Sequence, residues 1–108
     1  MSIRTASLLG ALGQEGALDV VLVLLKAPNG ESVGGIHDTV DLAQATVTRR
    51  LQELSVVGLV EHERRGRPFR IREAARVSAL LRDASELAER LLELDQLAER
   101  AFRDNLPP

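Results

Sequence analysis

The sequence contains no cysteine and only two histidines, His37 and His62, among its 108 residues. The missing thiols exclude disulfide bonds, thiolate nucleophiles, iron–sulfur clusters and cysteine zinc sites. These two residues are therefore the only ones that could offer an imidazole ligand to a metal.

Long hydrophobic runs are also lacking. The longest uninterrupted apolar stretch covers residues 20–25, whereas a bilayer crossing needs roughly 20 apolar residues. The first residues show neither an apolar signal core nor a small-residue cleavage site. We therefore expect no membrane partner and a cytoplasmic location.

The formal net charge is only −2, but the charges are unevenly spread. Residues 1–40 carry two basic and four acidic side chains, residues 41–76 carry eight and five, and residues 77–108 carry four and seven. Five of the arginines lie between residues 64 and 72. Such a basic tract in an otherwise acidic protein favours contact with a polyanion, although a solvated surface strand without a partner would show the same pattern.

The amino-terminal third predicts three helices. Apolar residues recur at three-residue steps after Ser2, which predicts a short helix over residues 2–12. Residues 17–27 are almost wholly apolar and predict a fully buried central helix that ends at Pro28. A weaker helix is predicted over residues 33–39, because Gly34 and Gly35 each cost about 1 kcal/mol relative to alanine in a helix interior.

A stronger amphipathic helix follows. Asp41 and Gln44 have the spacing of a capping box, and Gly58 marks the end of the helix. Val47 lies on one stripe with Leu51 and Leu54, which predicts the buried face. The opposite face carries Ala45, Arg49 and Gln52, flanked by Thr46 and Thr48. Small side chains and long hydrogen-bonding arms of this kind suit a helix that reads base edges in the major groove.

After Gly58 the pattern changes to that of a hairpin, with strands over residues 59–64 and 69–72 and a turn over residues 65–68. Two short strands are not stable alone in water. We therefore expect them to lie on the helices, with Val60, Phe69 and Ile71 facing inward and the arginines facing outward.

Residues 17–72 resemble the winged helix-turn-helix regulators, most closely the ArsR-like group. The resemblance rests on residues 41–51, then on Leu54, on residues 58–60 and on the arginine-rich hairpin. It implies that the turn and recognition helix run from Leu42 onward, that residues 58–60 lead into the wing, and that flanking helices pair two subunits. The implied fold is mostly α with a small β-hairpin wing.

Three positions depart from the family pattern. Ala43 stands where a hydroxyl residue usually caps the recognition helix and touches phosphate, so we expect Asp41 to cap it instead. Asp41 in turn replaces a glycine of the turn, and aspartate tolerates left-handed geometry moderately well. His37 stands where a small residue is usual. With Gly34 and Gly35 nearby, we expect this first helix of the motif to be the least stable element.

The turn of the wing, Arg65-Gly66-Arg67-Pro68, also resembles the core with which AT-hook peptides enter the minor groove. Glycine would let the backbone approach the groove floor, while the two arginines meet the negative potential of a narrow, A·T-rich groove. Any hairpin of this family needs a glycine-containing turn, however, and its arginines often touch only phosphate. The sequence leaves both interpretations open.

The last third of the chain shows a heptad pattern over four repeats, with one apolar position from Val77 to Ala98 and a second from Leu80 to Ala101. A helix of about 30 residues is roughly 45 Å long, too long for one small domain to cover. We therefore expect a second subunit to pack on it, while a hairpin with the first helix is the alternative. The predicted dimer interface comprises Leu9, Leu80, Ala84, Leu87, Leu91, Leu94 and Ala98.

These patterns predict a DNA-binding core over residues 1–72, whose first helix over residues 2–12 also joins the dimer interface, and a dimerisation helix over residues 73–108. Arg49 is expected to reach a guanine edge and Arg50 a phosphate. The predicted DNA-binding residues are Gln44, Ala45, Thr46, Thr48, Arg49, Arg50, Gln52, Arg64, Arg65 and Arg67.

Enzymatic chemistry finds little support. The acidic residues lie at helical spacing among arginines, as solvated ion pairs do, and neither a nucleophile elbow nor a phosphate loop is present. In the family that the chain resembles, metal-sensing members use cysteine clusters or paired histidines and carboxylates along the last helix. The corresponding helix here has neither cysteine nor histidine, so we expect no metal and no cofactor. The predicted function is sequence-specific binding of double-stranded DNA by a homodimeric transcriptional regulator. The alternative is a winged-helix module that binds protein, as in antitoxins or complex subunits, without using DNA.

Overall fold

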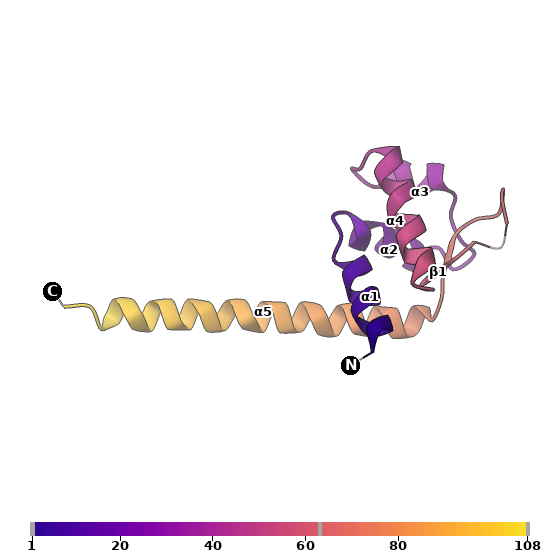
Figure 1. Ribbon diagram of the computed structural model, residues 1–108. Coiled ribbons are helices and arrows are strands. Elements are labelled where there is room, and N and C mark those ends of the chain that lie inside the picture. Colours follow the sequence, from indigo (N-terminus) through magenta and orange to yellow (C-terminus); the bar gives the residue numbers. More distant parts are fainter. Residues whose placement is uncertain (1, 63, 108) are drawn as a thin grey trace. The chain divides into compact units, whose positions relative to one another are not determined.

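The computed structural model describes residues 2–62 and 64–107 (Figure 1). Its elements are α1 (Ile3–Leu12), α2 (Ala17–Leu25), α3 (Val33–Thr39), α4 (Gln44–Val56), β1 (Val60–Glu61), β2 (Arg70–Ile71) and α5 (Ala74–Asp104). The chain divides into two compact units, one that ends at Ala74 and one that begins at Ala75. A mostly helical fold with one small antiparallel hairpin was predicted, and it is confirmed.

The core of the first unit is built around α2. Val20, Val21 and Leu24 are fully buried there, and burial of such side chains contributes roughly 1.5–3 kcal/mol each. They pack against α3 and α4, which contribute Ile36, Val47, Leu51 and Leu54. The prediction of a fully buried α2 is wrong in one respect. Leu18 and Leu22 lie on a face of α2 that is nearly half exposed, because α3 and α4 leave that face uncovered.

The two short helices α1 and α3 begin at serine caps. The Ser2 hydroxyl accepts a hydrogen bond from the Thr5 backbone N–H at 3.1 Å, and the Ser32 hydroxyl accepts one from Gly35 at 3.0 Å. The bounds of α3 agree with the prediction despite its two glycines. Its single buried side chain among the described residues, Ile36, is what ties this short helix to the core.

The start of α4 differs from the prediction. The helix begins at Gln44, and its N-cap is Ala43, which has no side-chain oxygen to offer. Asp41 is not the cap, because it lies two residues before the N-cap position, outside the helix. Nor does Asp41 adopt left-handed geometry: among the described residues, Glu73 is the only one other than glycine with a positive φ.

The hairpin is shorter than predicted, with two residues in each strand. Val60 pairs with Ile71, and Glu61 pairs with Arg70. A third segment joins through Glu31 and Phe69, whose backbone groups exchange two hydrogen bonds of 2.9 Å. Pairing stops at Phe69 because Pro68 has no N–H to donate. Val60 is buried, whereas Phe69 and Ile71 are only half-buried.

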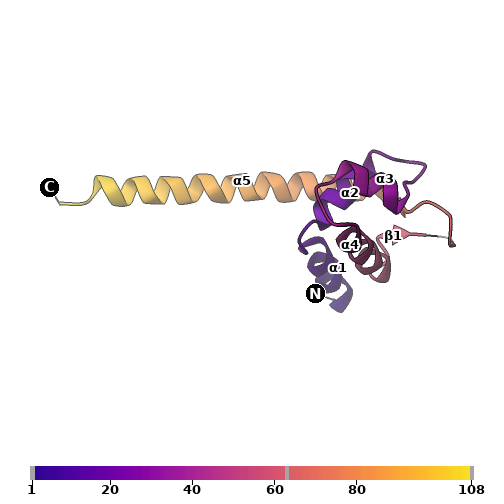
Figure 2. The same ribbon diagram turned by 90° about the horizontal axis from the view of Figure 1, so that it is seen from above.

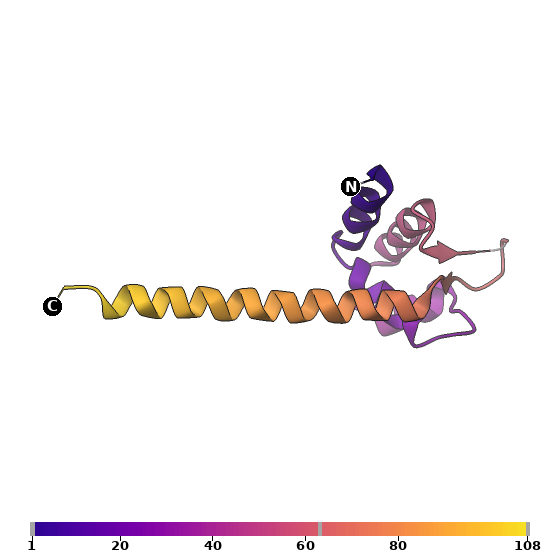
Figure 3. The same cartoon turned by 90° about the horizontal axis from the view of Figure 1, so that it is seen from below.

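The helix α5 is a single unbroken helix of 31 residues, seen from two sides in Figures 2 and 3. Val77 is its only buried residue among those described. The leucines of the predicted heptad are exposed, namely Leu80 by 38%, Leu87 by 59%, Leu91 by 52% and Leu94 by 45%. The helix therefore carries an apolar stripe that the described residues of its own chain leave in contact with solvent.

Candidate nucleic-acid interface

One face of α4 is free for a ligand. Val47, Leu51 and Leu54 turn inward and are fully buried. The predicted reading residues lie on the other side: Gln44, Ala45, Arg49 and Gln52 are exposed, while Thr46 and Thr48 are half-buried at its flanks. Because residues three and four apart share a helix face, Ala45, Arg49 and Gln52 form one continuous surface along the helix.

Arg50 does not lie on that surface. It is only 8% exposed, and its guanidinium donates to both carboxylate oxygens of Glu53 at 2.6 and 2.7 Å. Its Nε has no hydrogen-bond partner within residues 2–62 and 64–107. The spacing could have revealed this position, because residue 50 comes three after Val47 and four before Leu54 and so falls on the buried stripe. The structure therefore places Arg50 in the interior, whereas a phosphate contact requires it at the surface.

The wing supplies the second exposed basic surface. Arg64, Arg65 and Arg67 are all exposed, and no carboxylate in the described ranges forms an ion pair with them. The backbone closes a turn through the Arg67 N–H, which donates to the Arg64 carbonyl at 3.0 Å. Gly66 has φ +86°, and a Cβ built on it would meet no atom within 4 Å. The wing tip thus carries a glycine with open space around it between two free guanidinium groups.

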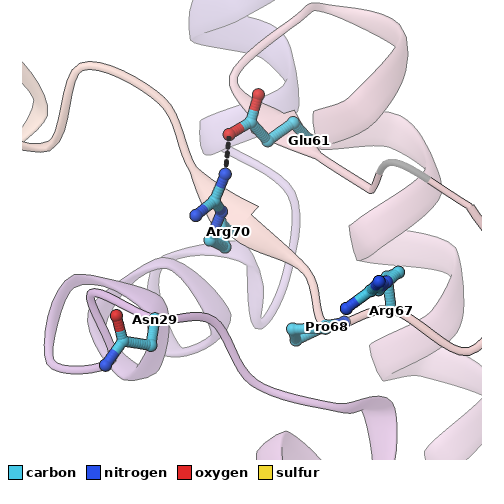
Figure 4. A pocket seen from close by; sticks show the side chains of 5 residues that line it. All are labelled: Asn29, Glu61, Arg67, Pro68 and Arg70. Atoms are coloured by element: carbon cyan, nitrogen blue, oxygen red, sulfur yellow. Dashed lines mark hydrogen bonds and ion pairs between the residues drawn. The ribbon is translucent and has the colours of Figure 1, made fainter.

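The other arginines of the basic tract have structural partners. Arg70 lies opposite Glu61 across the hairpin, with Nη2 3.2 Å from a carboxylate oxygen (Figure 4). Arg72 donates to the carbonyl of Gly58 at 3.2 Å. Arg70 was expected to face outward with the rest, but its half-exposed side chain pairs across the strands. These two cations therefore stabilise the root of the wing, whereas the arginines at the tip have no ion-pair partner within the described ranges.

The root of the wing is also held by close packing. Glu61, Pro68 and Arg70 line a cavity of about 160 Å³ together with Asn29 and Arg67 (Figure 4). Gly30 has φ +93°, and a Cβ there would lie 2.8 Å from Pro68 and 2.7 Å from Arg70. A side chain at residue 30 would therefore push the wing away, so glycine is required for this approach.

A groove joins the face of α4 to the wing. Thr48, Gln52 and Ser55 of α4 line it on one side, and Val60, His62 and Phe69 of the hairpin line it on the other. The rings of His62 and Phe69 stack with their centroids 4.0 Å apart. Neither His62 nor Phe69 is among the predicted DNA-binding residues, although the position of His62 in the wing placed it near phosphate. Their stacking depends on the register of the hairpin. The groove therefore connects Gln52 of the reading face with the base of the wing.

The predicted dimer residues are exposed in the part of the chain that the structure describes. Leu9 on α1 is 49% exposed, and Ala84 and Ala98 on α5 are exposed like the leucines beside them. Pairing of two subunits through these residues stays a prediction.

The described residues contain no group of three or more histidine, cysteine, aspartate or glutamate side chains that could hold a metal ion. Within the same residues, no single helix is both long and apolar enough to cross a membrane. Helices α1 and α2 together reach that length and composition, but they are bent by 91° at the break between them.

Comparison with known proteins gives matches among solved structures. No protein-family model matches the sequence, and no curated protein matches it. Six chains of known structure match, among them an ArsR-like transcriptional regulator from Rhodococcus sp. RHA1. That protein is 25% identical, with a TM-score of 0.57, and the match covers 88% of this chain and 92% of the other. The predicted resemblance to the ArsR-like winged helix fold is thereby confirmed.

Proposed function

We propose that this chain, which has the fold of an ArsR-like regulator, is a transcriptional regulator that binds double-stranded DNA sequence-specifically as a homodimer. The observation that supports this most directly is the groove that joins the exposed face of α4 to the base of the wing. Arg49 and Gln52 on that face have arms that can hydrogen-bond base edges. Arg64, Arg65 and Arg67 at the wing tip have charges with no ion-pair partner among the described residues.

The distribution of charge on this surface suits a nucleic acid. The chain is acidic as a whole, with a net charge of −2. Among the cations without an ion-pair partner in the described residues, Arg49 lies on the reading face and Arg64, Arg65 and Arg67 lie at the wing tip, whereas Arg50, Arg70 and Arg72 are held by partners. A local basic surface on an acidic protein directs a polyanion to one place and limits non-specific contact elsewhere.

The homodimer supplies the second half of the site. The exposed leucines of α5 offer an apolar stripe to a second copy of the chain. Two winged domains would then face two half-sites about one helical turn apart, roughly 34 Å from centre to centre. We expect the protein to act in the cytoplasm, by binding rather than by catalysis.

Selection of bound sequences from a random DNA pool tests the proposal. We expect an enriched sequence with two-fold symmetry, and an affinity that falls steeply as salt rises, because arginines on phosphates release counterions. A pool that yields no enriched sequence, together with no binding at low salt, would contradict DNA binding. Binding of a protein partner with little salt dependence would then favour the alternative, a protein-interaction module.

A further inference from the structure

The phenylalanines of this chain are few, and one of them lies outside the core. The sequence has two phenylalanines and neither tyrosine nor tryptophan. The buried apolar side chains that the structure describes are all aliphatic. Phe69 is only half-buried, and its ring stacks on the exposed His62 with 4.0 Å between centroids and 15° between planes. Core packing therefore does not account for this aromatic pair.

The groove between α4 and the hairpin, which the pair lines, has the size of a small-molecule site. Its volume is about 640 Å³, and ligand pockets span roughly 300–1,000 Å³ with a mainly apolar and aromatic lining. Val56, Val60 and Phe69 supply apolar surface to it. Val56 is 86% exposed, so a ligand that covered it would remove apolar surface from water.

The polar part of the lining is made of neutral groups. Thr48, Gln52 and Ser55 line the α4 side, and their hydroxyl and amide groups can both donate and accept hydrogen bonds. Among the described residues that line the groove there is no arginine, lysine, aspartate or glutamate. A phosphate there would lose water without gaining an opposite charge. The lining therefore favours an uncharged ligand with a polar group.

We propose that this groove binds a small, uncharged, planar aromatic molecule that carries a hydroxyl or carbonyl group. Phe69 covers one face of the His62 ring, and a ligand ring on the other face would continue the stack. Offset aromatic pairs gain affinity beyond the area that they bury. The polar group of the ligand would then meet the amide of Gln52 or the hydroxyl of Ser55 at the edge of the groove.

Occupation of the groove would also displace DNA, and this part of the inference rests on the proposed function. Gln52 belongs both to the lining of the groove and to the reading face of α4. The cations of the proposed DNA surface lie on either side, on α4 and at the wing tip, so DNA that contacts both would lie across the groove. A bound aromatic molecule therefore competes for the same surface and releases the operator.

Titration of the full chain with 2-naphthol, followed by NMR, tests the site. The control ligand is decahydro-2-naphthol, which has the same carbon skeleton and hydroxyl group but no aromatic ring. We expect saturable shifts of the methyl signals of Val56 and Val60, with affinity for 2-naphthol roughly three- to tenfold above that for the control. Equal affinity for the two compounds, or no saturable shift at these valines, would overturn the proposal.

Variants of the aromatic pair give the second arm. Phe69→Leu should lower the affinity for 2-naphthol by roughly three- to tenfold and leave that for the saturated compound unchanged. His62→Leu should act in the same way, and it replaces an exposed ring, so the result does not depend on the stability of the Phe69 variant. Phe102→Leu, which removes the other phenylalanine on α5, is the matched control. Unchanged affinity for 2-naphthol in both groove variants would overturn the role of the stack.

Competition with DNA is measured by fluorescence anisotropy on the duplex selected from the random pool. 2-Naphthol at ten times its own Kd should raise the apparent Kd for DNA by about tenfold, and the Phe69→Leu and His62→Leu variants should need more of it for the same effect. Unchanged DNA affinity with the groove occupied would overturn displacement. If the unmodified chain binds no duplex, the proposed function fails, while the NMR titration still decides whether the groove is a ligand site.

Discussion

At the scale of single residues, Arg49 and Arg50 are neighbours in sequence with opposite surroundings. Arg49 is exposed on the face of α4 that the core leaves free, while Arg50 is buried and held by Glu53. A helix turns by about 100° per residue, so adjacent side chains readily fall on different faces. The same residue type is therefore accessible to a ligand at one position and held within the fold at the next.

The change Arg49→Ala should weaken binding to the selected DNA by about 1–3 kcal/mol and relax the preference at one base pair. The reason is the loss of a side chain that can donate two hydrogen bonds to a guanine edge. Anisotropy titrations on the selected duplex and on random DNA measure the difference. Arg4→Ala removes an equal charge from an exposed site on α1 and should affect both duplexes little. Equal losses on the two duplexes for the Arg49 variant would show that this residue does not read a base.

Arg50 should act on stability instead. Replacement by alanine leaves a cavity beside Glu53 and deprives its carboxylate of a partner, so we expect a loss of roughly 1–3 kcal/mol in the free energy of unfolding. Replacement by methionine also deprives Glu53 of its partner, but it keeps most of the volume and removes the unpartnered Nε, so it should cost less stability than the alanine change. Urea denaturation of the two variants tests the contrast. A methionine variant as unstable as the alanine variant would show that the ion pair itself holds α4 in place.

At the scale of elements, α4 starts without a side-chain cap. Ala43 has φ −61° and ψ 145°, the extended geometry of an N-cap residue, but no oxygen to accept from the first turn. The change Ala43→Ser should add that acceptor and stabilise the protein by about 0.5–2 kcal/mol. Thermal unfolding measures the gain. Ala45→Ser, inside the helix and equally exposed, is the control and should not stabilise.

Periodicity predicted the helices well, because apolar residues spaced by three and four fit one face of a helix and do not fit the two-residue period of a strand. It placed the buried face of α4 on Val47, Leu51 and Leu54, as observed. It did not place the start of that helix, since Asp41 and Gln44 match a capping box in spacing while the backbone around Asp41 follows the turn instead. Capping depends on local backbone angles, and these are set by how α3 and α4 pack.

The hairpin is a second element whose details could not be predicted from the sequence. Alternation predicted strands of six and four residues, but only two residue pairs form between the described parts of these segments, because Pro68 has no N–H to donate. The ion pair of Arg70 with Glu61 and the stack of His62 on Phe69 both depend on cross-strand register. The register is set by how the two strands pair in the folded chain and cannot be deduced from composition. The sequence therefore showed a basic tract, but it did not show which of its arginines have structural partners.

At the scale of the whole molecule, the exposed apolar stripe of α5 leads us to expect that the chain associates with a second copy in solution. A helix of 31 residues is about 46 Å long, and isolated helices are marginally stable in water unless an apolar face is buried. Leu87 and Leu91 are each more than half exposed in the single chain. A second copy that covers them would stabilise the helix and hold two reading surfaces together.

Light scattering on the unmodified chain at micromolar concentration should therefore give a mass near twice 11.8 kDa. Leu87→Asp and Leu91→Asp each place a charge in the apolar interface at a cost on the order of several kcal/mol, so either should yield a monomer or an unfolded chain. Gln96→Asp introduces the same side chain on the polar face of α5 and should leave the dimer intact. A monomer mass for the unmodified chain would show that α5 meets a different partner. Because half-sites one turn apart need two reading helices held together, the aspartate variants should also lose preference for a two-fold symmetric site while each winged domain keeps weak binding to a single half-site.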